Sequence, residues 1–339
     1  MPLAKAGPPD RRGAFRARIE RHSLRPFWEA LGVPTPPHPA PACVPALWRY
    51  REVRPLVIEA ARLIGVHDAE RRALALENPG LRGAFSITHS LYAGLHTLLP
   101  SELASRHRHT RWSLRLLLEG DGAYTVHEGQ RLAHRPGDFI VVAPWSGHDQ
   151  GNAGGTLAVW LEEIEVPTVA PLESVPDEGR IGDSCATSLP GDAPSVGDAL
   201  PPDSGSDATL LAYPYARTRQ ALASMRATCA PHPSHGFRMR CAARPYAVPA
   251  TLEAFVELLP AGFRGRPSRT TDSTVYCVLE GRGESRIGGQ TLGWESRDIF
   301  VVPSWSSATH VAAQETVLIG YSDRPAQQAL GLWREETLD

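Results

Sequence analysis

Three histidines stand at positions from which their side chains could meet around one metal ion. His107 and His109 flank Arg108 in the stretch HRHTRWSLR, and His148 follows in GHDQGN. Successive side chains of a β-strand alternate between its faces, so His107 and His109 project to one side with Cα atoms about 6.5–7 Å apart. A turn that returns a later strand beside the first would add His148. The spacing therefore predicts a three-histidine metal site, and ligand type alone leaves zinc, iron(II) and manganese open.

Arg115 lies close to these histidines in the sequence and shares their predicted direction. It follows His109 by six residues, and this even spacing places both on the same face if the strand continues. A guanidinium that points into a barrel needs an anion. A carboxylate bound at the metal would supply one, and arginine holds such a group with directed donors. We predict that Arg115 binds a substrate carboxylate.

Short strands must position these residues. Over residues 84–166, short apolar or alternating runs such as SLRLLLEG and DFIVVAP are separated by Gly, Pro and Asp, which is typical of an antiparallel barrel or sandwich. Residues 1–83 show helical spacing, notably in LWRYREVRPLVIEAARLIG. Residues 167–208 are rich in Pro, Gly, Ser and Asp, and we predict a flexible linker there. Residues 209–339 open with a helical stretch and return to the strand pattern.

The strand pattern is an internal duplication. LEGDGAYTVHEGQRLAHRPGDFIVVAPW aligns with LEGRGESRIGGQTLGWESRDIFVVPSW, so Asp138 matches Asp298 and Trp145 matches Trp305. We interpret these pairs as framework and the tryptophans as core. If the histidines only packed the barrel or lay at its surface, the second copy should keep some of them. Their loss indicates chemistry in the first copy. The second copy has Ser268, Thr270 and Ala308 at the positions of His107, His109 and His148, and Tyr276 at that of Arg115.

Composition excludes several classes of function. The formal net charge of −2 gives no bulk attraction to nucleic acid or to an anionic membrane. Lys5 is the only lysine and lies in a polar terminal stretch, which argues against Schiff-base chemistry. No apolar run reaches membrane-spanning length, and the first residues have no signal-like apolar region. We predict a cytoplasmic protein with no nucleic-acid or membrane partner.

A family resemblance follows from these motifs. ELASRHRHTRWSLRLLLEG with PGDFIVVAPWSGHDQGN resembles the cupin signature, and LWRYREVRPLVIEA, SLYAGLHTLLP and SDRPAQQALGLWREE resemble gentisate 1,2-dioxygenase and its salicylate-cleaving relatives. The similarity covers nearly the whole chain except residues 167–208. It implies an all-β bicupin fold: two double-stranded β-helix (jelly-roll) barrels, with short helices at the N-terminus and between the barrels. The N-terminal cupin would hold the metal, the C-terminal cupin would lack ligands and end in a helix, and the chain would form a homotetramer.

The resemblance also implies an activity. Members bind Fe(II) and insert O2 between the carboxyl-bearing and hydroxyl-bearing carbons of gentisate, which gives maleylpyruvate. Most cupins add a glutamate ligand, whereas TRWSL has no acid, in agreement with this family. The resemblance assigns His107, His109 and His148 to the metal, and Arg115, His96 and Gln150 to catalysis. It assigns Arg71, Arg115, Ala73, Gly94 and Glu162 to substrate binding.

Several positions depart from the family pattern. His96 replaces a glutamine, Gln150 replaces a histidine, Gly147 replaces a tryptophan and Glu162 replaces an aspartate. The first two look like an exchange that preserves one imidazole near the substrate or fits a different ring substituent. Our hypothesis is that the substrate is a substituted salicylate and not necessarily gentisate.

Two other functions compete with ring cleavage. One is a non-catalytic cupin that binds or senses an aromatic acid. The other is a metal-dependent hydrolase, decarboxylase or isomerase on the same scaffold, against which the missing carboxylate ligand and the apolar neighbourhood SLRLLL argue. His127 and His134 fall in predicted turns, and we interpret them as surface residues.

Overall fold

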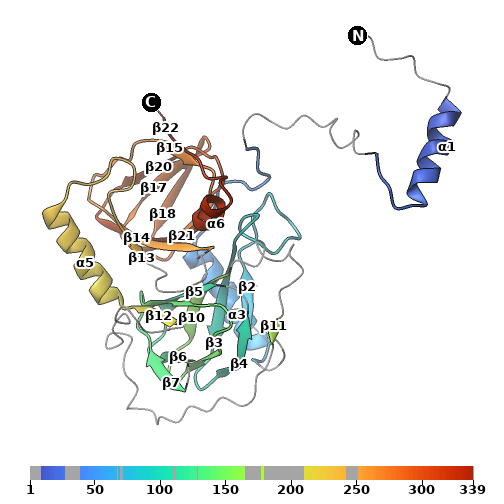
Figure 1. Ribbon diagram of the computed structural model, residues 1–339. Helices are drawn as coiled ribbons and strands as arrows, with labels where there is room; N and C mark the ends of the chain where they lie inside the picture. The colour runs from blue at the N-terminus through green and yellow to red at the C-terminus, as the bar shows by residue number, and fades with distance from the viewer. Residues whose placement is uncertain are drawn as a thin grey trace. The chain divides into compact units, whose positions relative to one another are not determined.

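The structure is a computed structural model that describes residues 9–26, 39–66, 68, 72–109, 112–127, 129–164, 177–178, 210–241 and 251–338 (Figure 1). The chain divides into two compact units, Met1–Pro39 and Ala40–Asp339. The first unit contains helix α1 (Pro9–Glu20), which is rich in arginine. The second unit contains both repeats and every predicted site residue.

The first barrel consists of two antiparallel sheets. Their order is β12-β8-β5-β10-β3-β2 in the larger and β11-β4-β9-β6-β7 in the smaller. The strands are β2 (Ala73–Ala75), β3 (Tyr92–Leu98), β4 (Leu103–His109), β5 (Ser113–Glu119), β6 (Ala123–His127), β7 (Gln130–Ala133), β8 (Phe139–Val142), β9 (His148–Asn152), β10 (Ala158–Ile164), β11 (Asp177–Glu178) and β12 (Leu210–Tyr213).

The second barrel repeats this plan. Its sheets have the orders β1-β19-β16-β21-β14-β13 and β18-β17-β20-β15-β22. The strands are β1 (Ala46–Trp48), β13 (Phe237–Cys241), β14 (Glu253–Leu259), β15 (Ser268–Thr270), β16 (Thr274–Glu280), β17 (Arg282–Ile287), β18 (Gln290–Glu295), β19 (Ile299–Val302), β20 (Ala308–Ala312), β21 (Thr316–Ser322) and β22 (Glu335–Thr337). Helix α6 (Arg324–Ala329) lies between the last two strands. The predicted bicupin fold is confirmed.

The first strand of each half of the chain pairs with a sheet of the barrel that the other half forms. Strand β1, from the N-terminal half, pairs with β19 of the second barrel, and β12, which follows the predicted linker, pairs with β8 of the first. Both are edge strands of the larger sheets, where they cover backbone groups that would otherwise be unpaired. The exchange makes the two barrels depend on each other.

The helices that follow these strands are exchanged as well. Helices α3 (Tyr50–Leu63) and α5 (Tyr215–Thr228) begin directly after β1 and β12. The Tyr50 N–H donates to Asp298 Oδ1 and the Tyr215 N–H donates to Asp138 Oδ1, each over 2.8 Å. The repeated aspartates therefore hold the start of a helix from the opposite half.

The predicted domain boundaries stay a prediction, and the sheets cross them. The segment 1–83 is helical in α1 and α3 but also contains strands β1 and β2. Local helical spacing gives no sign of these strands because their pairing partners lie far along the chain. The segment 209–339 begins with β12, which belongs to the first barrel's sheet. The predicted linker 167–208 lies outside the described residues except for β11, which pairs with Arg108 and His109 of β4.

One apolar core joins the barrels and two smaller ones fill them. The largest cluster combines side chains of both larger sheets, including Leu95 and Leu116 of the first barrel and Val256 and Ile319 of the second. The outer faces of these sheets thus bury each other. Each barrel also has its own interior apolar cluster. The cluster of the first barrel surrounds Trp160, and the second barrel has a separate cluster. No helix among the described residues is long and apolar enough to cross a membrane.

The repeated tryptophans are not core residues, contrary to the prediction. Trp145 is 47% exposed and Trp305 is partly exposed. Both adopt positive φ angles, 62° and 59°, and both donate a backbone hydrogen bond of 2.6 Å, to His109 and to Thr270 respectively. Their repetition reflects equivalent tight turns. The pattern alone could not separate a repeated turn from a repeated core position.

Candidate metal centre

Two neighbouring strands bring the three histidines together. His107 and His109 lie on β4, His148 lies on β9, and His107 and His148 are Cα partners in the sheet. The ring centroids are 4.5 Å apart for His107 and His148, 5.2 Å for His109 and His148, and 5.8 Å for His107 and His109. One nitrogen from each imidazole lies within 4.8 Å of the others, and all three side chains are buried. The predicted clustering is therefore present.

The tautomer of His148 follows from its two contacts. Its Nδ1 lies 2.8 Å from the carbonyl oxygen of Ser146, which can only accept, so Nδ1 carries the proton and donates. Its Nε2 lies 2.9 Å from the Arg115 Nη2 group, which can only donate. Nε2 therefore carries the lone pair that a metal would bind, and in this structure that lone pair accepts from Arg115. A backbone carbonyl that fixes the opposite nitrogen is the usual support of a metal-binding histidine.

Electrostatics keep this ligand neutral. Burial, then Arg115 and the two other imidazoles, lower the pKa of His148 well below its ordinary value. Metal ligation requires neutral imidazole, and His148 is held in that form. Three buried nitrogen donors without a carboxylate suit a divalent transition metal that keeps coordination positions open. The donor set fits a metal ion.

A buried ion pair lies beside the histidines. Arg115 on β5 and Glu162 on β10 are Cα partners, and each is 2% exposed. Arg115 donates to Glu162 Oε1 from Nη2 over 2.8 Å and from Nε over 3.2 Å. The same Nη2 group reaches His148. Glu162 thus compensates a charge that would be costly to bury alone, and it orients the guanidinium toward the metal centre.

The other predicted substrate residues share one face of the same sheet. His96 and Gly94 lie on β3, where they pair with Trp160 and Glu162 of β10, and Ala73 of β2 pairs with His96. His96 is buried, with 3% exposed, and its ring centroid lies 6.0 Å from that of Trp160. It is therefore an interior residue and not one that faces solvent. Arg71 lies outside the described residues.

Gln150 also points into the first barrel. It lies two residues after His148 on β9, so both share a face, and it is 2% exposed. Its Nε2 group is buried and has no hydrogen-bond partner among the described residues. Gln150 is the Cα partner of Thr125 on β6. A buried amide donor is therefore held near the three imidazoles.

His134 was missed as an interior residue. It is 5% exposed, not at the surface, and its Nε2 lies 2.9 Å from Thr125 Oγ1. Burial, and then Arg115, lower its pKa to about 3. The signal for this was its spacing of two from Leu132, which is also buried. His134 is therefore a neutral ring in the interior.

The space beside Gly147 is limited by a neighbouring side chain. A Cβ atom at Gly147 would lie 3.1 Å from the Nη2 atom of Arg106 and 3.3 Å from its Nε atom. A bulky side chain could enter only if the flexible end of Arg106 moved. Arg106 thus takes part of the space that a tryptophan would occupy.

The second barrel carries no equivalent site. Ser268, Thr270 and Ala308 occupy the corresponding strand positions on β15 and β20, and none of them is a strong metal ligand. Within the described ranges, the three-histidine group is the only one that could hold a metal. An antiparallel barrel with a buried three-histidine site, joined to a barrel without ligands, defines a metal-binding bicupin.

Known proteins support this class and refine it. The model of the cupin domain matches residues 94–163. Gentisate 1,2 dioxygenase 1 of Aquipseudomonas alcaligenes is 40% identical and covers 96% of each chain. The 1-hydroxy-2-naphthoate 1,2-dioxygenase of a Nocardioides species is 30% identical over 95% of this chain and 87% of its own. A crystal structure of salicylate 1,2-dioxygenase from Pseudoaminobacter salicylatoxidans with gentisate superposes with a TM-score of 0.87, at 28% identity over 99% of this chain and 96% of its own.

The chain belongs to the gentisate 1,2-dioxygenase family of ring-cleaving dioxygenases. The family and the donor set together indicate a metal-dependent enzyme.

Proposed function

We propose that this protein is an Fe(II)-dependent dioxygenase that cleaves the ring of gentisate or a related substituted salicylate. The observation that carries the proposal is the presence of three buried imidazoles in one barrel of a chain from this family, together with their absence from the other. His107, His109 and His148 would hold the metal. Bound Fe(II) would supply the electron transfer between an aromatic acid and O2 that neither reactant achieves alone.

Substrate recognition rests on chemistry that the relatives' substrates share. Gentisate, salicylate and 1-hydroxy-2-naphthoate each carry a carboxylate beside a hydroxyl on an aromatic ring. We propose that Arg115 donates to this carboxylate, because its guanidinium lies 2.9 Å from His148 and is oriented by Glu162. Arg71 is proposed as a second contact on the strength of the family resemblance alone.

The remaining pocket residues would discriminate among ring substituents. Gln150 offers a buried amide donor without a partner among the described residues, which suits a hydrogen bond to an oxygen on the ring. His96 would contact the ring from the opposite sheet, with Ala73 and Gly94 on the neighbouring strand positions. The bond between the carboxyl-bearing and hydroxyl-bearing ring carbons would break, and both atoms of O2 would enter the single ring-opened product.

We also propose a homotetramer, as the resemblance implies.

A panel of substrates tests the activity. The protein is loaded with Fe(II) without oxygen, mixed with gentisate, salicylate or 5-substituted salicylates, and exposed to air. Oxygen uptake and the near-ultraviolet absorbance of a ring-opened keto acid are followed together. His109→Ala should abolish both, whereas Thr270→Ala, at the equivalent position of the second barrel, should leave both unchanged. Binding of an aromatic acid without oxygen uptake on any panel member would instead favour the non-catalytic cupin.

A further inference from the structure

A cavity lies in the second barrel where the first barrel has its metal centre. It has a volume of about 360 Å³, which is within the usual range for small-molecule sites. Ser268, Thr270 and Ala308, the equivalents of the three histidines, line it, as does Tyr276, the equivalent of Arg115. The second copy has therefore kept the space of the site and changed its chemistry.

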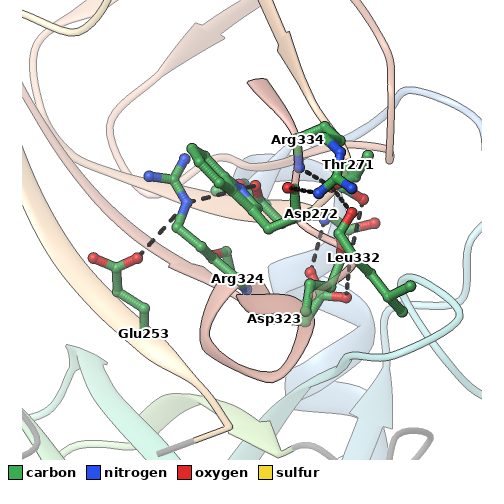
Figure 2. A network of polar contacts seen from close by, with 12 residues as sticks. Glu253, Thr271, Asp272, Asp323, Arg324, Leu332 and Arg334 are labelled. Atoms are coloured by element: carbon green, nitrogen blue, oxygen red, sulfur yellow. Dashed lines mark hydrogen bonds and ion pairs between the residues drawn. The ribbon is translucent and has the colours of Figure 1, made fainter. Parts of the chain in front are cut away.

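Arg324 lines this cavity, and its Nε atom lies near two carboxylates without a hydrogen bond to either. Nε lies 3.5 Å from Asp272 Oδ1 and 3.9 Å from Glu253 Oε2, and both ion-pair lines end on this atom in Figure 2. The guanidinium also lies over the Trp333 ring, 4.8 Å from its centroid. Asp272 is fixed in turn by a 2.7 Å hydrogen bond from Trp333 Nε1. The position of Arg324 is thus set before any ligand binds.

The terminal nitrogens of Arg324 remain available. They form no hydrogen bond with the described residues, although the side chain is only 11% exposed and lines the cavity. The three other arginines of the lining each direct nitrogens at a protein carboxylate: Arg238 at Glu257, Arg240 at Glu253 and Arg269 at Glu336. A planar pair of donors that faces a cavity from a fixed position is the arrangement that binds a carboxylate.

Two large aromatic side chains contribute to the walls of the cavity, which are otherwise mostly polar. Phe255 and Tyr276 line it, in edge-to-face contact with centroids 5.8 Å apart, and Phe300 stacks on Tyr276 at 5.0 Å. His235 and His310 also line it. These are interior aromatic surfaces, against which a flat apolar ligand loses water and gains contact.

Two imidazoles of the cavity lining have lowered pKa values. Burial, then Arg238, lower the pKa of His310 to about 4, and the same causes, with smaller contributions from His232 and Arg324, lower that of His235 to about 3. Both rings are therefore neutral at physiological pH and add no positive charge to the cavity.

We propose that the cavity of the second barrel is a metal-independent binding site for a small aromatic carboxylate, with Arg324 as its carboxylate-binding residue. The aromatic side chains of Phe255 and Tyr276 contact the ring of the ligand. The proposal does not depend on ring cleavage in the first barrel, since it rests on residues of the second barrel alone.

Calorimetric titration with benzoate tests the proposal. The full chain carries His107→Ala and His109→Ala, so that the metal centre contributes no binding. We expect one benzoate per chain. Adding Arg324→Gln should weaken binding at least about tenfold, whereas Arg334→Gln, which removes the same charge from a neighbouring residue outside the cavity, should change it less than about twofold. Inorganic phosphate, an anion without a ring, should bind at least about tenfold more weakly than benzoate.

A second variant separates loss of binding from loss of fold. Ala308→Trp fills the cavity and leaves every ion pair of Arg324 in place, so it should also abolish benzoate binding while the melting temperature stays near that of the parent. Absence of benzoate binding in the parent would overturn the proposal. So would equal binding in Arg324→Gln or in Ala308→Trp, or phosphate binding as tight as that of benzoate.

Discussion

At the scale of single residues, both barrels enclose an arginine that is paired with a buried glutamate. Arg115 and Glu162 form this pair in the first barrel, and Arg238 and Glu257 form it in the second, where Glu257 is fully buried. The pairs come from different strand positions. Arg115 lies within hydrogen-bond distance of His148, whereas Arg238 is far from any candidate metal ligand among the described residues. A comparison of variants in the two ion pairs therefore separates effects on stability from effects on substrate binding.

Glu162→Gln should damage both stability and substrate binding. Removing one partner of a buried ion pair costs about 3–5 kcal/mol, because the other charge stays buried without compensation. The Arg115 guanidinium also loses its orientation, so the KM for the aromatic acid should rise. Glu257→Gln is the matched control: it should lower the free energy of unfolding by a similar amount and leave KM unchanged. Urea denaturation and steady-state kinetics measure the two effects, and an unchanged KM in Glu162→Gln would contradict the role given to this pair.

His310 should make stability depend on pH. Trp294 Nε1 donates to Ser285 Oγ over 2.8 Å, and the Ser285 hydroxyl lies 2.7 Å from His310 Nδ1. Burial and Arg238 lower the pKa of His310 to about 4, against 6.5 for an ordinary histidine. Between these values the unfolded chain takes up a proton that the folded chain does not. The free energy of unfolding should therefore fall as pH falls from about 6.5 towards 4, by on the order of 1 kcal/mol per pH unit.

His310→Gln tests this effect, since glutamine stands at the equivalent position of the first barrel. Urea denaturation between pH 5 and pH 8 should show a shallower pH dependence in the variant. Equal slopes in the variant and the parent would mean that His310 is protonated in the folded chain.

At the scale of elements, repeated residues mark turns and helix starts, not only core. Asp298 accepts from the Tyr50 N–H over 2.8 Å and from the Glu295 N–H over 3.1 Å, and so joins helix α3 to the β18–β19 turn. The sequence predicts that Asp138 and Asp298 are framework. It could not indicate that each binds a helix from the other half, because such a contact leaves no local periodicity.

Asp298→Ala should therefore loosen a helix that lies far away in the sequence. The buried Tyr50 N–H group would lose its acceptor, at about 1–3 kcal/mol, and the Glu295 N–H group would lose its acceptor at a more exposed position. Amide hydrogen exchange should accelerate at the start of α3, in the N-terminal half. Asp138→Ala should do the same at the start of α5. Acceleration confined to the mutated turn in both variants would contradict the exchanged arrangement.

At the scale of the whole molecule, the largest core belongs to both barrels. It combines buried residues of the two larger sheets, such as Leu116 and Val275, and the exchanged strands β1 and β12 complete sheets of the opposite half. A separated half would expose a large apolar face and an unpaired sheet edge, both of which promote aggregation.

Residues 40–209 and 210–339 should therefore fail to fold when produced separately and should form a stable complex when produced together. Circular dichroism and size-exclusion chromatography would measure this. A soluble, cooperatively folding single half would contradict the interdependence of the barrels. The intact chain is the control.

The sequence predicts the two-barrel fold and the metal-site histidines because both depend on short-range patterns. Alternating strands, turn residues and the HxH spacing are local, and the duplication reveals which residues one copy has lost. The buried position of His134 and the ion pair between Arg115 and Glu162 depend on which strands meet across the barrel. The exposure of Trp145 depends on a turn with positive φ. Strand pairing and turn geometry are tertiary properties, which local spacing does not determine.

The most direct test of the central claim is the fate of labelled oxygen. The Fe(II)-loaded protein is supplied with 18O2 and with the panel substrate that supports oxygen uptake, and the ring-opened product is analysed at once by mass spectrometry. The proposed function predicts that both labelled atoms appear in one product molecule, and that His109→Ala gives no product. A product that carries one labelled atom or none would contradict ring cleavage by a dioxygenase at the three-histidine centre.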